Sequence, residues 1–415
     1  MNISFFGLSH LGLNYLAASA SKGFKVVGYD ENKDLIKKLQ LKKKIFQEPL
    51  LFENLKKFKK NITFTNNIND LKKSKIIFIS SDVETNKHGK SDIKKIKKNI
   101  STIKSKFKNK NLIILSQVKP GFTSNLIWNK SKLFYQVETL VFGEAFKRAL
   151  NPERIILGVD KTLKKINAEV QKFYRRFNCP IIKTDYNTAE IIKISINLYL
   201  ISSISTTNLL SSIVKKINGN WPDLESALRL DKRIGKYAYL KPGLGISGGN
   251  LERDLFNISG ISKQKGISNE LFEIFKKNSI NQKLWPYKIY RRYFKKAKGI
   301  KLGILGLAYK KNTNSIKNSP SLELIKKIKK NKVFIYDPIV KKIRKQKNVI
   351  ISKNTKEVIN NTDILFIMTP WDEFKKIDIN IIKKSKIKKI VDPFGLLLFR
   401  KNFFINNKIK YYSLI

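Results

Sequence analysis

Short apolar runs separated by lysine-rich amphipathic stretches predict alternating strands and helices in the first 185 residues. The run Asn2–Phe6 leads into Gly7-Leu-Ser-His-Leu-Gly12 and a helical pattern that extends to about Lys22. A second run, Lys25–Tyr29, precedes Asp30 and completes a βαβ unit. Strands alternating with helices favour a parallel, doubly wound sheet. Further strands are predicted at Ile62–Thr65, Ile76–Ser80, Leu112–Ser116 and Ile155–Val159.

The pattern changes near Asp185. Between Thr188 and about Lys216 the chain has no glycine or proline, which predicts one long helix. A loop dense in glycine and proline, Lys241–Asn250, is followed by more helix to about Lys296. A strand-and-glycine pattern returns at Gly299–Gly306. Later strands are predicted at Lys332–Tyr336, Ile364–Met368 and Lys389–Val391.

These patterns predict an α/β protein with three domains. Two Rossmann-like doubly wound domains are expected at residues 1–185 and 299–415. A central all-helical domain at 186–298 joins them. No low-complexity linker separates the three, so we expect them to pack on one another.

Composition excludes several classes of protein. No apolar run approaches the ~18–20 residues that span a bilayer, and the N-terminus lacks a signal-peptide pattern. We therefore expect a cytoplasmic protein. Cys179 is the only cysteine, and His10 and His88 are the only histidines. A disulfide framework or thiolate metal cluster is excluded, and no metal site is expected.

The formal net charge is +54, and lysines account for 74 of the 85 basic residues. They are spread along the whole chain as doublets between apolar residues, whereas nucleic-acid binders concentrate charge and use arginine for bidentate contacts. Solvated lysine-rich faces are the preferred interpretation, with nucleic-acid binding as the weaker alternative. Such a field also attracts polyanionic ligands, including dinucleotides and nucleotide sugars.

The first glycine loop predicts a dinucleotide site. It reads Gly7-x-Ser9-x-x-Gly12, with serine at the place of the middle glycine, and the turn residues expected at the cofactor include Leu11. Serine crowds the approach of a pyrophosphate, although its hydroxyl could donate to it. Asp30 follows Gly12 by 18 residues, where a carboxylate accepts from the adenosine ribose. That acid favours NAD over NADP, because it repels a 2′-phosphate.

Nine segments in register resemble the UDP-glucose/GDP-mannose dehydrogenases over nearly the whole chain. No single match is decisive, but all occur in the family's order. They are Glu48-Pro49, Ser116–Thr123, Asn151–Arg154, the Ala-Glu-x-x-Lys-x-x-x-Asn helix at Ala189–Asn197, Arg233–Gly235, Leu305–Thr313, Ser319-Pro320, Thr369–Phe374 and the glycine loop Gly243–Asp254.

The resemblance implies NAD-dependent oxidation of the C6 alcohol of a nucleotide sugar, a UDP-hexose foremost, for polysaccharide synthesis. It implies an N-terminal NAD domain, a C-terminal domain that binds the nucleotide, and a central helical domain that forms a homodimer. The sugar is then expected in the cleft between the two α/β domains.

The resemblance also assigns roles to residues. Lys193 and Asn197, four apart on one helix face, are expected to bind the substrate oxygen, and Asp254 to hold a water as proton relay. Glu138 is expected in acid–base work or water ordering. The other expected cofactor contacts are Gln117, Arg253 and Lys317. The other expected substrate contacts are Arg233 of a neighbouring subunit, Tyr239, Gly243 and Lys310.

Several positions depart from the family's pattern, among them Lys317 for an arginine and Arg253 for a lysine, and three departures remove a chemical group that the family uses. Asn250 stands where the family has its nucleophilic cysteine, and an amide cannot form a thiohemiacetal. Phe142 replaces a second glutamate, and Phe394 stands in for a substrate-binding arginine. Cys179 looks like a small buried residue rather than a substitute nucleophile. We therefore expect oxidation to stop after one hydride, with a catalytically silent nucleotide-sugar binder as the alternative.

Overall fold

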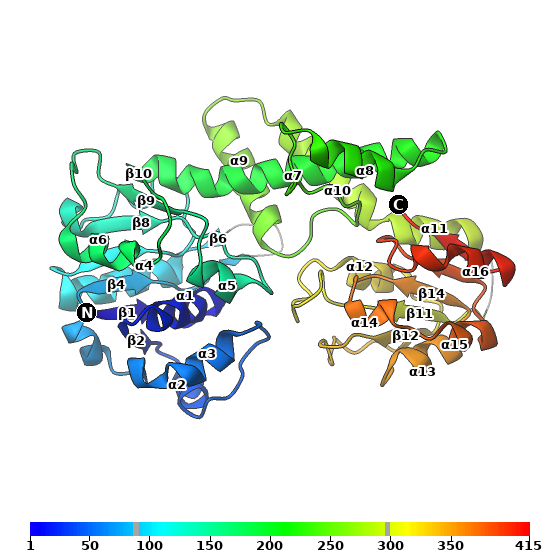
Figure 1. Cartoon of the computed structure of the whole chain (residues 1–415), viewed down its shortest axis with the longest axis horizontal. Coiled ribbons are helices and arrows are strands. Elements are labelled where there is room, and N and C mark those ends of the chain that lie inside the picture. The colour runs from blue at the N-terminus through cyan, green and yellow to red at the C-terminus, as the bar shows by residue number, and fades with distance from the viewer. Residues whose placement is uncertain (86–90, 295–298) are drawn as a thin grey trace. The chain divides into compact units, whose positions relative to one another are not determined.

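The computed structural model describes residues 1–85, 91–294 and 299–415 (Figure 1). The chain divides into two compact units, Met1–Ile196 and Asn197–Ile415. The division falls inside helix α7 (Tyr186–Lys216), which matches the long helix expected from Thr188. The three domain boundaries expected from the sequence stay a prediction.

The first unit contains an eight-stranded sheet in the order β10-β9-β8-β7-β4-β1-β2-β3. The expected first strand, second strand and turn between them are all present, and β8 and β10 add to the predicted set. The strands are β1 (Asn2–Phe6), β2 (Lys25–Tyr29), β3 (Ile62–Thr65), β4 (Ile76–Ile79), β7 (Asn111–Ile114), β8 (Leu133–Gln136), β9 (Ile155–Val159) and β10 (Ile181–Asp185). A small hairpin pairs β5 (Glu84–Thr85) with β6 (Ser91–Asp92).

One pair in this sheet is antiparallel, so the expectation of a wholly parallel sheet is wrong there. Strands β8 and β9 run in opposite directions, with Tyr135 opposite Gly158. The helix between them, α5 (Ala145–Leu150), packs against α1 (His10–Ser21). The connection from β8 to β9 returns to the same end of the sheet, so β9 begins beside the end of β8.

Alternate side chains of the central strands enter two separate cores. Phe5 and Phe78 belong to the core beneath α1, whereas Phe6 and Ile79 belong to the core beneath α4 (Lys94–Phe107). Because successive strand residues point to opposite faces, the sheet is covered on both sides, as a doubly wound fold requires. The other helices of this unit are α2 (Lys33–Gln40), α3 (Leu51–Lys57), α6 (Ala168–Arg175) and the 3₁₀ turns η1 (Lys59–Asn61), η2 (Ile68–Lys73) and η3 (Lys130–Lys132).

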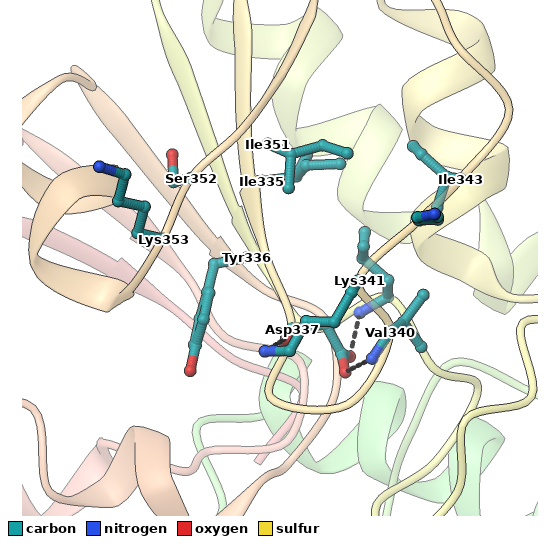
Figure 2. Close-up of a pocket in the computed structure, with 11 residues that line it drawn as sticks. Ile335, Tyr336, Asp337, Val340, Lys341, Ile343, Ile351, Ser352 and Lys353 are labelled. Atoms are coloured by element: carbon teal, nitrogen blue, oxygen red, sulfur yellow. Dashed lines mark hydrogen bonds between the residues drawn. The ribbon is translucent and has the colours of Figure 1, made fainter. Parts of the chain in front are cut away.

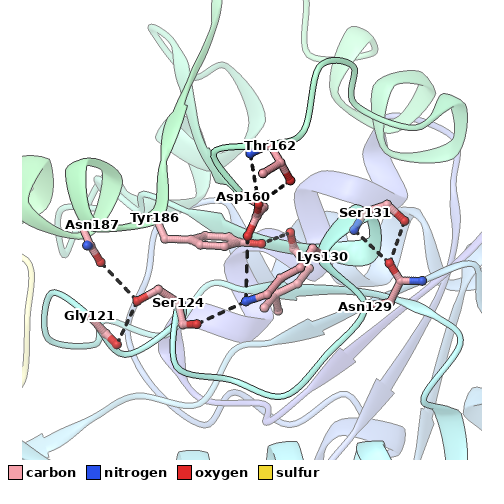
Figure 3. A network of polar contacts seen from close by, with 10 residues as sticks. Gly121, Ser124, Asn129, Lys130, Ser131, Asp160, Thr162, Tyr186 and Asn187 are labelled. Atoms are coloured by element: carbon pink, nitrogen blue, oxygen red, sulfur yellow. Dashed lines mark hydrogen bonds and ion pairs between the residues drawn. The ribbon is translucent and has the colours of Figure 1, made fainter.

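A polar network fastens the start of α7 to the sheet (Figure 3). The Tyr186 hydroxyl donates to the Leu133 carbonyl at 2.8 Å. Lys130 donates to the Ser124 carbonyl and lies 3.9 Å from the Asp160 carboxylate. Hydrogen bonds from Thr162 lower the pKa of Asp160. The first turn of α7 is therefore held by both a buried tyrosine and a network at the surface.

The second unit contains a six-stranded, all-parallel sheet in the order β13-β12-β11-β14-β15-β16. In chain order this repeats the arrangement of the first six strands of the first sheet. The sequence missed β13 and β16. The strands are β11 (Leu302–Leu305), β12 (Val333–Tyr336), β13 (Val349–Ile351), β14 (Ile364–Ile367), β15 (Lys389–Val391) and β16 (Lys410–Tyr412).

Helices make up the remainder of the second unit. The expected helix after the glycine loop is three helices, and its expected end at Lys296 lies outside the described residues. No helix in the described ranges is both long and apolar enough to span a membrane. The helices are α8 (Trp221–Leu230), α9 (Asn250–Gln264), α10 (Glu270–Lys283), α11 (Trp285–Phe294), α12 (Pro320–Lys327), α13 (Thr355–Asn360), α14 (Asp372–Lys375), α15 (Ile379–Lys384), α16 (Lys401–Asn406) and the 3₁₀ turn η4 (Leu398–Arg400).

Candidate active site

The turn between β1 and α1 requires glycine at both ends. Gly7 has a φ of +100°, and a Cβ there would lie 2.0 Å from Ser81 Oγ. A Cβ on Gly12 would lie 2.1 Å from the Gly7 carbonyl oxygen. Leu11, between them, is buried in the core and can offer a ligand only its backbone. The start of α1 thus packs closely against the turn at Gly7 and the residues that follow β4.

Ser9, at the place of the middle glycine, caps α1 and bridges to the end of β4. Its hydroxyl donates to the Ser80 carbonyl at 2.8 Å and accepts from the Asp82 amide at 3.1 Å. The hydroxyl proton is therefore engaged within the protein rather than directed to a ligand. The serine stiffens the turn that a middle glycine would leave open.

Asp30 ends β2 and closes the turn from the other side. Its carboxylate accepts from the Leu8 amide at 2.9 Å and the Asn32 amide at 3.0 Å. A carboxylate offers about four lone-pair positions, so Asp30 retains acceptor capacity for a ribose diol. It is 8% exposed.

An ion pair links the first unit's part of α7 to the loop after β8. Lys193 Nζ lies 3.1 Å from Glu138 Oε1, and both side chains are nearly buried. The other oxygen of Glu138 accepts from the Leu140 amide at 3.0 Å. The structure thus brings together two of the expected catalytic residues, a cation and a carboxylate.

Glu190, one turn before Lys193, has a role that the sequence did not reveal. Its two carboxylate oxygens accept from the Gly121 and Thr123 amides at 2.6 and 2.8 Å. Burial raises the pKa of Glu190, although these hydrogen bonds oppose the shift. The residue anchors to α7 the segment that carries Gln117, an expected cofactor contact, which is itself buried. The sequence signal available for this role was the position of Glu190 within the Ala189–Asn197 motif.

A second cluster that was not predicted surrounds His10, in the first turn of α1. His10 Nε2 lies 2.7 Å from Glu48 Oε2. Glu48 also accepts from the Gly143 and Ala145 amides. The ring of Phe142 stacks on His10 with centroids 4.2 Å apart. Phe142, which replaces a glutamate, therefore packs against α1, the helix that follows the first glycine loop.

Three further expected residues meet in the second unit. The Asn197 amide donates to one carboxylate oxygen of Asp254, and Arg253 Nε lies 3.2 Å from the other. All three are at most 6% exposed. Asp254 and Arg253 lie on α9, whereas Asn197 lies on α7. This is a buried, charge-balanced cluster with an amide oriented by a carboxylate.

Asn250 begins α9 and is exposed at the end of the glycine loop. A Cβ on Gly249 would lie 3.1 Å from the Lys317 side chain, and the Gly248 amide donates to the Lys317 carbonyl. Lys317 was expected at the cofactor, and here it lies over the residue before Asn250. The Lys310 ammonium lies 5.9 Å from the centroid of the Tyr309 ring, which packs on Gly248.

The remaining expected substrate contacts are spread more widely. Arg233 is 89% exposed and pairs with Asp231 at 2.7 Å, away from the cluster around Asp254. The carbonyl of Tyr239 accepts from two hydroxyls of α7, and the Gly243 amide donates to Asn208 at 2.8 Å. A Cβ on Gly243 would lie 3.4 Å from the Phe394 ring. The residue that replaces the expected arginine thus adjoins an expected substrate contact.

Three family models cover most of the chain. The NAD-binding domain of the UDP-glucose/GDP-mannose dehydrogenase family matches residues 1–178, its central domain 187–282, and its UDP-binding domain 303–397. The chain belongs to this family. It is accordingly an NAD-dependent nucleotide-sugar dehydrogenase, an oxidoreductase acting on a CH–OH group.

Relatives of this dehydrogenase match along most of their own length. The UDP-glucose 6-dehydrogenase of Rickettsia felis is 29% identical over 402 residues, covering 91% of this chain and 88% of the relative. The UDP-glucose 6-dehydrogenase TuaD of Bacillus subtilis is 26% identical, with 92% and 86% covered.

Solved structures share the fold of the dehydrogenase. A UDP-glucose dehydrogenase from Pyrobaculum islandicum has a TM-score of 0.86 at 20% identity and covers 100% of this chain and 97% of its own. A UDP-D-ManNAc dehydrogenase from Pyrococcus horikoshii has a TM-score of 0.82 at 24% identity, with 95% and 96% covered.

The residues of the first turn fit the NAD that this dehydrogenase family uses. Gly7 and Gly12 allow the tight turn that brings the N-terminus of α1 against the end of β1, and the amides of the first turn of α1 can bind a pyrophosphate. Asp30 retains the acceptor capacity that an adenosine ribose needs. NAD, when bound, supplies the hydride acceptor.

Proposed function

We propose that this dehydrogenase oxidises the C6 alcohol of a UDP-hexose to a carbonyl and stops after one hydride transfer. The alcohol loses a hydride to NAD and a proton to the protein, giving an aldehyde, NADH and a proton. The UDP-binding family model and the names of the relatives support the nucleotide. The cytoplasmic location expected from the sequence stays a prediction.

The residues that the first oxidation needs are present. Lys193, Asn197 and Asp254 retain the identities that the resemblance requires, and each is buried and oriented by a charged or amide partner. An ammonium and an amide one helical turn apart can both bind one substrate oxygen. The carboxylate of Asp254 can hold a water that takes the alcohol's proton.

Asn250 is the observation that limits the reaction. A cysteine at this position would capture the aldehyde as a thiohemiacetal, whose hydride is removed in the second oxidation to leave a thioester for hydrolysis. An asparagine amide can only hydrogen-bond to the aldehyde or its hydrate. Loss of a nucleophile commonly lowers a rate by several powers of ten. The second oxidation is therefore outside the catalytic timescale.

The test counts NADH against sugar consumed and identifies the product by mass spectrometry. We expect one NADH per sugar with a carbonyl product, and Asn250→Ala should leave that ratio at one. Asn250→Cys should raise it towards two, with a uronic acid as product. Two NADH per sugar from the unaltered enzyme would refute the proposal, because it requires hydrate oxidation without covalent capture. No NADH with any nucleotide sugar would favour a silent binder.

We further propose that the enzyme is a homodimer through its central helices. In the second unit, Tyr199, Leu209 and Ile213 of α7 and Ile217, directly after its end, are 47–80% exposed. Large apolar side chains grouped on one helix are typical of an interface. Light scattering should give twice the chain mass, and Ile213→Lys with Ile217→Lys should shift the protein to monomer. A monomeric unaltered enzyme at micromolar concentration would contradict this.

A further inference from the structure

A cavity of about 300 Å³ lies beyond the carboxyl ends of β12 and β13, wholly within the second unit (Figure 2). Its volume is at the lower end of small-molecule sites, enough for a nucleoside but not for a dinucleotide. In doubly wound sheets, ligands bind outside the carboxyl ends of the strands. The expected substrate contacts Lys310 and Gly243 are not among the residues that line it.

The walls of this cavity are largely aliphatic, and Tyr336, Asp337 and Ser352 add polar groups to them. Ile335 of β12, Val340 and Ile343 of the following loop, and Ile351 of the edge strand β13 form its walls. Ile351 is 51% exposed, so this wall of the cavity is open to solvent. Ser352 also lines the cavity and is 95% buried, yet its hydroxyl has no hydrogen-bond partner. A buried unpaired hydroxyl is costly, and a bound polar group would satisfy it.

The rim of the cavity is cationic. Lys341, Lys342 and Lys353 line it, and Asp337 is the one acid among the lining residues. Asp337 is 2% exposed, and both its carboxylate oxygens already accept hydrogen bonds from backbone amides and from Trp371. Its oxygens are therefore already used and do not bind a ribose diol, and the Lys341 ammonium donates to the Asp337 carbonyl oxygen at 3.2 Å. The cavity suits a molecule with an apolar, hydrogen-bonding body and an anionic end.

We propose that this cavity binds a nucleoside phosphate, as a nucleotide site separate from the substrate and cofactor sites. The base lies between the aliphatic walls and bonds to the Ser352 hydroxyl, and the phosphates lie at the three lysines. The site depends neither on Asn250 nor on the number of hydrides transferred. It gives the C-terminal unit a place where a nucleotide that is not a substrate can bind.

The first test compares two charge-matched variants by calorimetry with ADP, UMP and inorganic phosphate. Lys342→Glu with Lys353→Glu reverses two rim lysines, whereas Lys345→Glu with Lys347→Glu reverses two exposed lysines of the same loop outside the cavity. Nucleotide binding at other sites is common to both variants and cancels. We expect the rim variant to lose nucleotide affinity by at least about tenfold relative to the control, because lysine–phosphate bonds are charge-assisted.

A preference for ADP supports a site separate from that of the substrate. A preference for UMP would instead identify the cavity with the uridine site of the UDP-binding domain and overturn the proposal. Equal losses in both double variants would overturn the proposal in favour of the general lysine field. The proposal would also be overturned if the rim double variant bound every nucleotide as tightly as the unaltered protein does. It would likewise be overturned if inorganic phosphate bound as tightly as the nucleotides.

The second test concerns Ser352. Ser352→Ala removes an unpaired buried hydroxyl, so the melting temperature without ligand should stay the same or rise. The same change should weaken binding of the preferred nucleotide by about three- to tenfold, the range for one hydrogen bond. A purely structural serine would instead lower the melting temperature and leave affinity unaltered, which would overturn its place in the site.

Discussion

The two doubly wound sheets use the same turn for different purposes. In each, a glycine of positive φ follows the first strand, with φ of +100° at Gly7 and +94° at Gly306. In each, that glycine's amide donates to the last residue of the second strand at 2.8 Å. In each, an acid follows that strand, Asp30 in the first and Asp337 in the second. The same backbone turn thus follows the first strand of each sheet.

The acids differ in how many donors they serve. Asp30 accepts two backbone amides among the described residues. Asp337 accepts four backbone amides and the Trp371 indole N–H. The Asp30 carboxylate therefore retains capacity to accept hydrogen bonds from a ligand, whereas the Asp337 carboxylate is fully used within the protein. A strand–turn–acid pattern alone does not separate the two roles.

The largest expected effect is on stability. Asp337→Ala leaves five donors of a buried site without an acceptor, so the free energy of unfolding should fall by about 3 kcal/mol or more. Asp30→Ala should lower it by about half as much, because only two amides are left unpaired. Urea unfolding of both variants measures the difference. Equal losses of unfolding free energy in the two variants would mean that the number of hydrogen-bond donors does not determine how much each carboxylate stabilises the protein.

The second expected effect is on the cofactor. Asp30→Ala should weaken NAD binding about tenfold to a hundredfold, the range for hydrogen bonds to a charged group. It should also reduce the difference between the affinities for NAD and NADP, because no carboxylate then repels the 2′-phosphate of NADP. Calorimetry with both cofactors measures this, with Asp34→Ala as control for an exposed acid of α2. NADP binding as tight as NAD in the unaltered enzyme would remove Asp30 from the ribose site.

The smallest expected effect is at the residue two places after the first glycine, Ser9 in the first sheet and Ala308 in the second. Ser9→Ala should lower the free energy of unfolding by about 1 kcal/mol, because the bridge from Ser80 to Asp82 is lost. Ser9→Gly should lose the same bridge but bind NAD more tightly than Ser9→Ala, since the Cβ that crowds the pyrophosphate is gone. Equal NAD affinities in the two variants would contradict the crowding.

Local pattern predicted most of the fold. Most buried strands of both sheets, the glycine turn and α7 were predicted within a few residues, whereas the buried strand β8 was missed. The edge strands β10, β13 and β16 were also missed, because none of their residues is buried and β13 and β16 have only three residues each. The antiparallel β8–β9 pair was missed because direction depends on the route of the chain rather than on either strand's residues.

The candidate site was predictable in its residue types but not in its connections. The pairing of Lys193 with Glu138 joins residues 55 positions apart, and that of Asn197 with Asp254 joins residues 57 apart. The Ser9 hydroxyl is engaged by Ser80, 71 positions away. The saturation of Asp337 depends on Trp371. Such contacts arise from tertiary packing, which periodicity does not encode.

The spacing of residues within α7 limits which insertions and deletions the helix can accept. Lys193 and Asn197 share one face only because three residues separate them, and one deletion there would turn the following residues by about 100°. Glu190 accepts a hydrogen bond from the Gly121 amide, and this contact fixes the rotation of α7 about its axis at the start of the same segment. Exposed positions of the helix can accept many substitutions over evolutionary time. Insertions and deletions between residues 190 and 197 should be selected against even when they leave the helix intact.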